Sequence, residues 1–180
     1  QNKKPPTGQQ LADSIAQKFL GEQYLGRSLQ YISELAISET DLGTVQKYIA
    51  EIFKKFKAGD HHLRLPLYNW HSIFTTNYDL IIEDAYDKVP NRQQVLATFI
   101  KNGEKVQDKM SLPNSLMYSK LHGSITDIDD ANLPLILTPD QYIDHRENRD
   151  RLFVRLKEAS YEYPILFVGF SFEDHDIRSA

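Results

Sequence analysis

The feature that most constrains the fold is an alternation of short apolar runs with helical patterns from Leu67 onward. The apolar runs of strand length are 72–76, 95–100, 116–123, 133–138 and 164–171. Amphipathic stretches at 78–89 and 139–160 have helical spacing and lie between these runs. Strands separated by helices are connected by crossovers, so the alternation predicts an α/β fold with a mostly parallel sheet.

The first third of the chain, residues 1–66, is helical by pattern. Apolar side chains recur at helical spacing in 11–20, 28–36 and 40–59, with Thr40 or Asp41 as the N-cap of the third helix. The apolar stripe of that helix, Val45 to Phe56, is either ordinary core or an oligomerisation surface. Residues 101–115 are polar and contain glycine and proline, so we expect a loop there. Together these patterns predict one domain over 1–180.

Composition excludes several classes of protein. The net charge is −4, so the electrostatic footprint of a dedicated nucleic-acid binder is missing. The cysteine count is 0, which rules out disulfides, cysteine zinc sites and thiol nucleophiles. No apolar run approaches the roughly 20 residues of a membrane span, and the N-terminus lacks a signal-peptide pattern. We therefore expect a cytoplasmic domain without membrane contact, cut at both ends from a longer chain.

Polar side chains follow three of the apolar runs directly. Asn77 and Asp79 follow the first, His122 lies at the end of the third with Ser124 directly after it, and Ser171 ends the last. Each has a simple alternative: Asn77 or Asp79 caps the next helix, and the others belong to turns. In a parallel sheet, however, all three positions open onto the edge where ligands bind. Their joint occurrence favours a ligand site.

The segments "TTNYD", "KLHGS" and "GFSFED", in this order, resemble the sirtuin-like domains. The nearest forms are those of the bacterial defence-associated branch, and the resemblance covers about Trp70 to Ile177. It implies a Rossmann-like sheet with flanking helices and NAD⁺ as the substrate. It also implies a cytoplasmic NAD⁺ glycohydrolase that depletes NAD⁺ in antiphage defence, with a homo-oligomer and a sensor or effector partner.

The resemblance also implies roles for single residues. Asn77 matches the asparagine that positions the nucleophile near the nicotinamide ribose, and His122 matches the catalytic histidine. Asp79 matches the carboxylate that faces the nicotinamide carboxamide. The residues expected to bind the cofactor are Thr75, Thr76, Asn77, Tyr78, Asp79, Gly123, Gly169, Phe170 and Ser171.

Two departures from the family pattern refine this hypothesis. The deacetylase branch carries a four-cysteine zinc module, so we expect neither a metal nor protein deacylation here. The glycine-rich phosphate loop is also missing, and we expect it upstream of Gln1 in the parent protein. Water is then the acceptor, and the fragment alone is expected to be weakly active or inactive.

Two alternatives come from other functional classes. The first is a divalent-metal site for phosphodiester hydrolysis, formed by the acidic side chains of Asp127, Asp129 and Asp130 together with those of 173–176. The simpler interpretation of these side chains is a solvated acidic loop. Metal-dependent cleavage would stop with a chelator, whereas sirtuin-like NAD⁺ hydrolysis would not. The second alternative is a non-catalytic nucleotide-sensing or assembly module. Asn77→Ala would abolish turnover in an enzyme but leave assembly intact in either case. Direct nucleic-acid binding is not expected in any of these cases.

Overall fold

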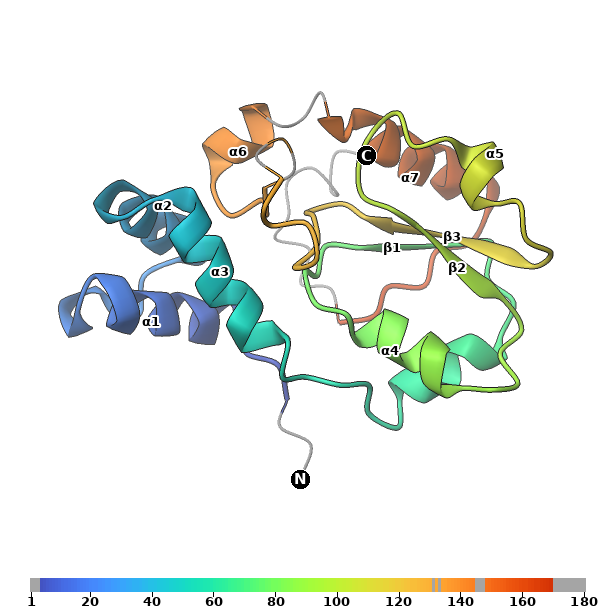
Figure 1. Ribbon diagram of the computed structural model, residues 1–180, viewed down its shortest axis with the longest axis horizontal. Helices are drawn as coiled ribbons and strands as arrows, with labels where there is room; N and C mark the ends of the chain where they lie inside the picture. The colour runs from blue at the N-terminus through green and yellow to red at the C-terminus, as the bar shows by residue number, and fades with distance from the viewer. Residues whose placement is uncertain (1–3, 131, 133, 145–147, 170–180) are drawn as a thin grey trace.

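The structure is a computed structural model, and it describes residues 4–130, 132, 134–144 and 148–169 (Figure 1). Its N-terminal part contains α1 (Gly8–Phe19), η1 (Glu22–Tyr24), α2 (Leu29–Glu39), α3 (Leu42–Phe53) and η2 (His62–Leu67). The part with the sheet contains β1 (Ser72–Thr75), α4 (Ile81–Lys88), β2 (Val95–Phe99), α5 (Val106–Lys109), β3 (Ser115–Lys120), α6 (Pro139–Asp144) and α7 (Asp150–Glu162).

The sheet is parallel, with the strand order β1-β3-β2. Thr75 of β1 lies opposite Lys120 of β3, and Phe99 of β2 lies opposite Ser119. Helix α4 lies on one side of the sheet and α7 on the other (Figure 1). The fold is therefore α/β and Rossmann-like, which confirms the predicted class.

The central strand β3 is covered on both faces, which explains its apolar sequence. Met117 and Leu121 face the cluster that includes Phe99 and Leu152 of α7. On the opposite face, Tyr118 and Lys120 contact Glu83 of α4. The alternation of these contacts follows the two-residue period of a strand.

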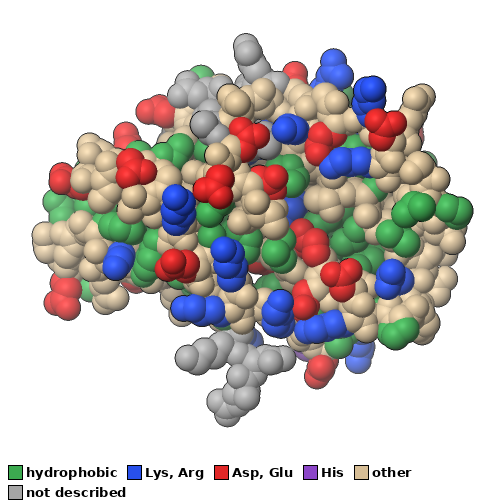
Figure 2. Space-filling view, viewed as in Figure 1, with side chains coloured by type: hydrophobic (Ala, Val, Ile, Leu, Met, Phe, Trp, Pro, Cys, Tyr) green, Lys and Arg blue, Asp and Glu red, His purple; other side chains and the backbone are tan. Residues whose placement is uncertain are grey.

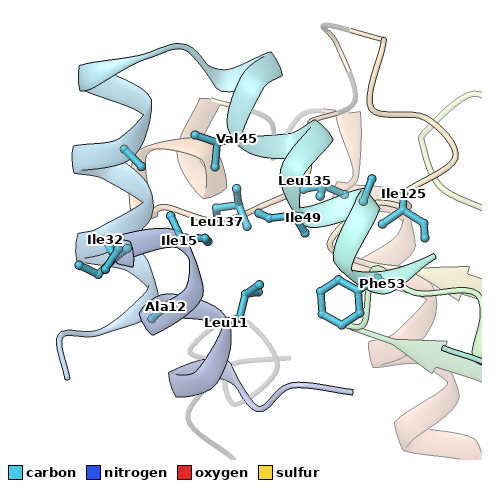
Figure 3. Close-up of a cluster of buried hydrophobic side chains, with 13 residues drawn as sticks. Leu11, Ala12, Ile15, Ile32, Val45, Ile49, Phe53, Ile125, Leu135 and Leu137 are labelled. Atoms are coloured by element: carbon cyan, nitrogen blue, oxygen red, sulfur yellow. The ribbon is translucent and has the colours of Figure 1, made fainter. Parts of the chain in front are cut away.

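Helices α1 to α3 begin at side-chain caps. Thr7, Ser28 and Asp41 each accept a hydrogen bond from the third residue after them, so the predicted N-cap Asp41 is confirmed. The three helices enclose an apolar cluster with Ile15, Ile32 and Ile49 at 0 % exposure (Figure 3).

The helical cluster also takes in residues that follow β3. Ile125, Leu135 and Leu137 are buried in it, and they lie next to Ile49 and Phe53 of α3 (Figure 3). In the apolar stripe of α3, Val45, Ile49 and Phe53 are buried in this core. Of the two predicted interpretations of the stripe, ordinary core is therefore the one that holds at these residues. The N-terminal helices and the chain leaving the sheet share one core.

Two predicted strands are absent from the described residues. Residues 134–138 are buried but irregular, and the backbone N–H groups of Leu135 and Leu137 donate to the side chains of Gln46 and Gln141. Residues 164–168 are irregular and exposed, and they pair with no strand that the structure describes. An apolar run becomes a strand only where a neighbouring backbone is available for hydrogen bonding.

Smaller corrections concern helices. The predicted loop 101–115 contains one helical turn, α5, and the predicted amphipathic segment 139–160 forms two helices, α6 and α7. Helix α3 ends at Phe53, before the end of the predicted helical stretch 40–59, and its C-cap is Lys54.

Candidate active site at the ends of β1 and β3

The loops that follow β1 and β3 are joined by backbone hydrogen bonds. Leu121 N donates to Thr75 O at 2.8 Å, and Ile125 N donates to Tyr78 O at 3.0 Å. Because β1 and β3 are parallel neighbours, both loops leave the same edge of the sheet. The segments carrying Asn77 and His122 are therefore held side by side, as the sequence predicts.

In the β1 loop, the side chain of Asn77 is exposed, and its backbone N–H donates to Thr75 Oγ1 at 3.1 Å. Thr75 and Thr76 are half-buried. Asp79 is buried, and its Oδ1 accepts a hydrogen bond from Ile81 N at 2.9 Å where α4 begins. The N-cap of α4 is Leu80, which makes no side-chain cap bond, so Asp79 is not the cap but bonds to the first helical residue from the position before the cap. This bond fixes the direction of the carboxylate.

Tyr78 anchors the β1 loop to the rest of the molecule. Its ring meets that of Phe53 edge-on, with centroids 6.3 Å apart, and its hydroxyl donates to Ile136 O at 2.6 Å. The loop thereby contacts both α3 and the irregular segment 134–138, where the sequence predicts a strand.

In the β3 loop, His122 is buried, with 6 % exposure. Its backbone carbonyl accepts a hydrogen bond from Ile136 N at 3.0 Å, so Ile136 bonds to both loops. Ser124 Oγ lies 2.8 Å from Thr126 Oγ1 within the same loop. The irregular segment 134–137 is therefore the third side of the site.

Gly123 has a φ of +92°, which L-residues with a side chain rarely adopt. A Cβ at this position would lie 3.1 Å from Pro134 O and 3.2 Å from Arg149 Nη2. The absence of a side chain lets Arg149 Nη2 and Pro134 O lie close to the backbone of Gly123.

Arg149 is 1 % exposed, and its Nη2 donates to Pro134 O at 2.6 Å. Within the described part of the chain, its Nε and Nη1 have no hydrogen-bond acceptor. Burial lowers the pKa of Arg149 to about 10, although Tyr78 partly opposes this effect. The sequence does not predict Arg149 as a site residue, because its segment has the pattern of a solvated amphipathic helix.

The site also rests on a buried ionic network that sequence reasoning missed. Lys120 Nζ, on a side chain with 0 % exposure, donates to Glu83 Oε1 at 2.9 Å and to the backbone carbonyl of Asp79. Tyr118 donates from its hydroxyl to Glu83 Oε2 at 3.3 Å. Burial, reinforced by the charges of Glu83 and Asp79, raises the pKa of Tyr118 well above its usual value. A lysine inside an apolar strand is a signal for such a network, since buried charges need partners.

The third predicted strand end is described only in part. Gly169 has a φ of +64°, and a Cβ at this position would meet no described atom within 4 Å. Phe170 and Ser171 lie outside the described residues. The structure therefore brings together two of the three polar segments.

The acidic loop after Ser124 is held by ordinary turn contacts. Asp130 accepts from Asn132 N at 2.9 Å and lies 3.8 Å from Lys101 Nζ. Among the residues described, no three His, Asp or Glu side chains are grouped so as to hold a metal ion. Residues 173–176, the other half of the proposed metal site, lie outside that part of the chain.

Charged side chains of both signs are interspersed over the face seen in Figure 2. Over the same described residues, none of the helices is long and apolar enough to cross a membrane.

Comparison with known proteins identifies the fold that carries these loops. The family model of the SIR2-like domain matches residues 71–180, from the residue before β1 through both site loops. The chain belongs to the SIR2-like family. No curated protein matches the sequence. SIR2-like domains bind NAD⁺, so the edge of the sheet occupied by the two loops is the place to look for a nucleotide site.

The two bonded loops at this edge of the SIR2-like domain carry an amide and an imidazole. Asn77 is exposed, Gly123 carries no side chain, and His122 is buried, with its backbone carbonyl bonded to Ile136 N. Amide and imidazole groups can bind ribose hydroxyls and orient a water molecule. Such a set suits cleavage at an anomeric carbon.

Proposed function

We propose that this SIR2-like domain hydrolyses NAD⁺ to ADP-ribose and nicotinamide, with Asn77 and His122 as the catalytic residues. The observation that carries the proposal is the pairing of their two loops at one edge of the sheet, through Leu121 N to Thr75 O and Ile125 N to Tyr78 O. Thr75, Thr76, Tyr78, Asp79, Gly123, Gly169, Phe170 and Ser171 complete the proposed nucleotide site.

For this reaction, the protein must position the substrate and the water molecule more than it must supply a strong general acid. Nicotinamide leaves as a neutral molecule from a cationic glycoside, and the transition state resembles an oxocarbenium ion. Asn77 holds the attacking water beside the anomeric carbon, and neutral His122 accepts the proton that the water loses. One NAD⁺ and one water thus yield ADP-ribose, nicotinamide and a proton. No metal enters the proposed reaction.

In the cell, the proposed role is depletion of NAD⁺ during antiphage defence. The proposal rests on the resemblance of "TTNYD" and "KLHGS" to the defence-associated branch, together with membership of the SIR2-like family. It includes a homo-oligomer and a sensor or effector partner that triggers hydrolysis.

The test is nicotinamide release from NAD⁺ by the full-length protein, followed by chromatography with and without EDTA. We expect release to survive EDTA and to fall by about 10²- to 10⁴-fold in Asn77→Ala and in His122→Ala. Asn91→Ala and His61→Ala are matched controls, since they remove the same side chains from exposed positions outside the two loops.

Two results would overturn the proposal. Loss of release in EDTA would indicate metal-dependent chemistry. Measurable NAD⁺ binding with no release under any activating condition would indicate a nucleotide-sensing module.

A further inference from the structure

Lys120 is a buried cation directly beneath the proposed site, and the hydrolysis described above does not use it. It ends β3 and lies two residues before His122 in the chain. Its Nζ donates to the backbone carbonyl of Asp79 and to Glu83 Oε1. The Lys120 side chain therefore links β3, the strand that leads to His122, to the turn that contains Asn77.

The turn from Asn77 to Asp79 is also held at its middle residue, since Tyr78 O accepts from Ile125 N and the Tyr78 hydroxyl donates to Ile136 O. Asn77 N binds Thr75 Oγ1 within the turn, and the Asp79 carboxylate binds the start of α4. The ladder between β1 and β3 ends with Leu121 N to Thr75 O, before Asn77 is reached. Beyond the ladder, Ile125 N bonds to Tyr78 O, and the contact from Lys120 to the Asp79 carbonyl adds a direct connection from β3 itself to the end of the turn.

Glu83 has a separate part in this arrangement. Bringing a lysine to 0 % exposure is costly unless an anion lies beside it, and Glu83 supplies that anion from the first turn of α4. The carboxylate stabilises the buried charge, while the Asp79 carbonyl receives the positioning bond. Mutation can separate the two contributions.

We infer that Lys120 is a positioning residue for the proposed hydrolysis: it holds the Asn77–Asp79 turn in fixed register with His122. The inference rests on the proposed function. A displacement of about 1 Å between catalytic groups can lower turnover by about 100-fold, so a single buried contact of this kind is sufficient to matter.

The experiment compares Lys120→Met with the double variant Lys120→Met/Glu83→Gln in the full-length protein. The double variant removes both buried charges, so it avoids the unpaired Glu83 carboxylate that the single variant leaves behind. Four quantities are measured: kcat and KM for nicotinamide release, the Kd of ADP-ribose, and amide hydrogen exchange over residues 76–81.

The control is Lys109→Met. Lys109 also donates to a backbone carbonyl, that of Thr98, and to a carboxylate, that of Glu104, but it lies beyond the two site loops. We expect its removal to leave kcat within about twofold of wild type.

For both Lys120 variants, we expect kcat to fall by about 10- to 100-fold while the Kd of ADP-ribose changes by less than about threefold. Exchange should quicken over 76–81 and stay unchanged in α1 to α3. Recovery of wild-type kcat in the double variant would overturn the inference, since Lys120 would then serve only to neutralise Glu83. Unchanged exchange over 76–81 would also overturn it.

Failure of the proposed function gives a different result. If the wild-type protein releases no nicotinamide but the Lys120 variants still show faster exchange over 76–81, hydrolysis is refuted and the positioning role stands.

Discussion

At the scale of single residues, Gly123 shows how one missing side chain shapes the site. Its left-handed backbone turns the chain immediately after His122, and the space that a Cβ would fill is taken by Pro134 O and Arg149 Nη2. Both neighbours are fixed, since Arg149 is buried and donates to Pro134 O. The backbone beside the histidine therefore has little freedom to move.

We expect Gly123→Ala to destabilise the fold by about 2–4 kcal/mol, because strain at a positive φ is added to a clash with the Pro134 carbonyl. Urea unfolding measures the loss. Gly26→Ala is the matched control, since Gly26 has a φ of +78° but no atom near its Cβ position. Its cost should be only about 1 kcal/mol. Equal losses in the two variants would show that the contact with Pro134 does not matter.

At the scale of elements, Asp84 joins α4 to the chain that follows α3. Its carboxylate accepts from Ala58 N at 2.8 Å and from Lys88 Nζ at 2.7 Å, and it lies 3.6 Å from Lys57 Nζ. Burial opposes ionisation, but the hydrogen bonds from Lys88 and Ala58 and the charges of both lysines hold the pKa of Asp84 below 3.8. Ionised Asp84 therefore stabilises the folded state.

We expect Asp84→Asn to lower the free energy of unfolding by about 1–2 kcal/mol at pH 7. Because the folded-state pKa lies below the unfolded one, this contribution is complete above the unfolded pKa and is lost as pH falls. The difference between wild type and variant should therefore shrink from about pH 5 to pH 2 in urea titrations. Asp87→Asn, an exposed change on the same helix, serves as control. A difference independent of pH would contradict this account.

The same scale shows what sequence can predict. All three strands and the first helices follow from local apolar periodicity and caps, and the site loops from polar residues at strand ends. The segment 134–138 has the same apolar pattern, yet its backbone bonds to Gln46, a residue 89 positions from Leu135. The partnership of Lys120 with Glu83 spans 37 positions. Such pairings leave no local signal, so they appear only in three dimensions.

At the scale of the whole molecule, the N-terminal helices and the site share one core. Ile49 of α3 is fully buried beside Leu135 and Leu137, and Ile136 between them bonds to both site loops. Packing of the helices is thus connected to the position of His122 through a few neighbouring residues.

We expect Ile49→Ala to lower the free energy of unfolding by about 2–5 kcal/mol, from lost burial and the cavity that remains. Nicotinamide release should fall as well, because the segment 134–137 loses its support. Urea unfolding and the release assay measure the two effects. Lys47→Ala, on the exposed face of the same helix, should change neither. A loss below about 1 kcal/mol would show that the cluster is not the main support of the helices.

The strand order β1-β3-β2 also determines when this molecule can become ordered during its synthesis. β1 and β2 leave the ribosome first, but they are not neighbours in the sheet and form no ladder with each other. Residues 115–137 then supply the central strand, the His122 loop and three side chains of the helical core, those of Ile125, Leu135 and Leu137. The described sheet and the helical core are therefore completed together, by one stretch of nascent chain.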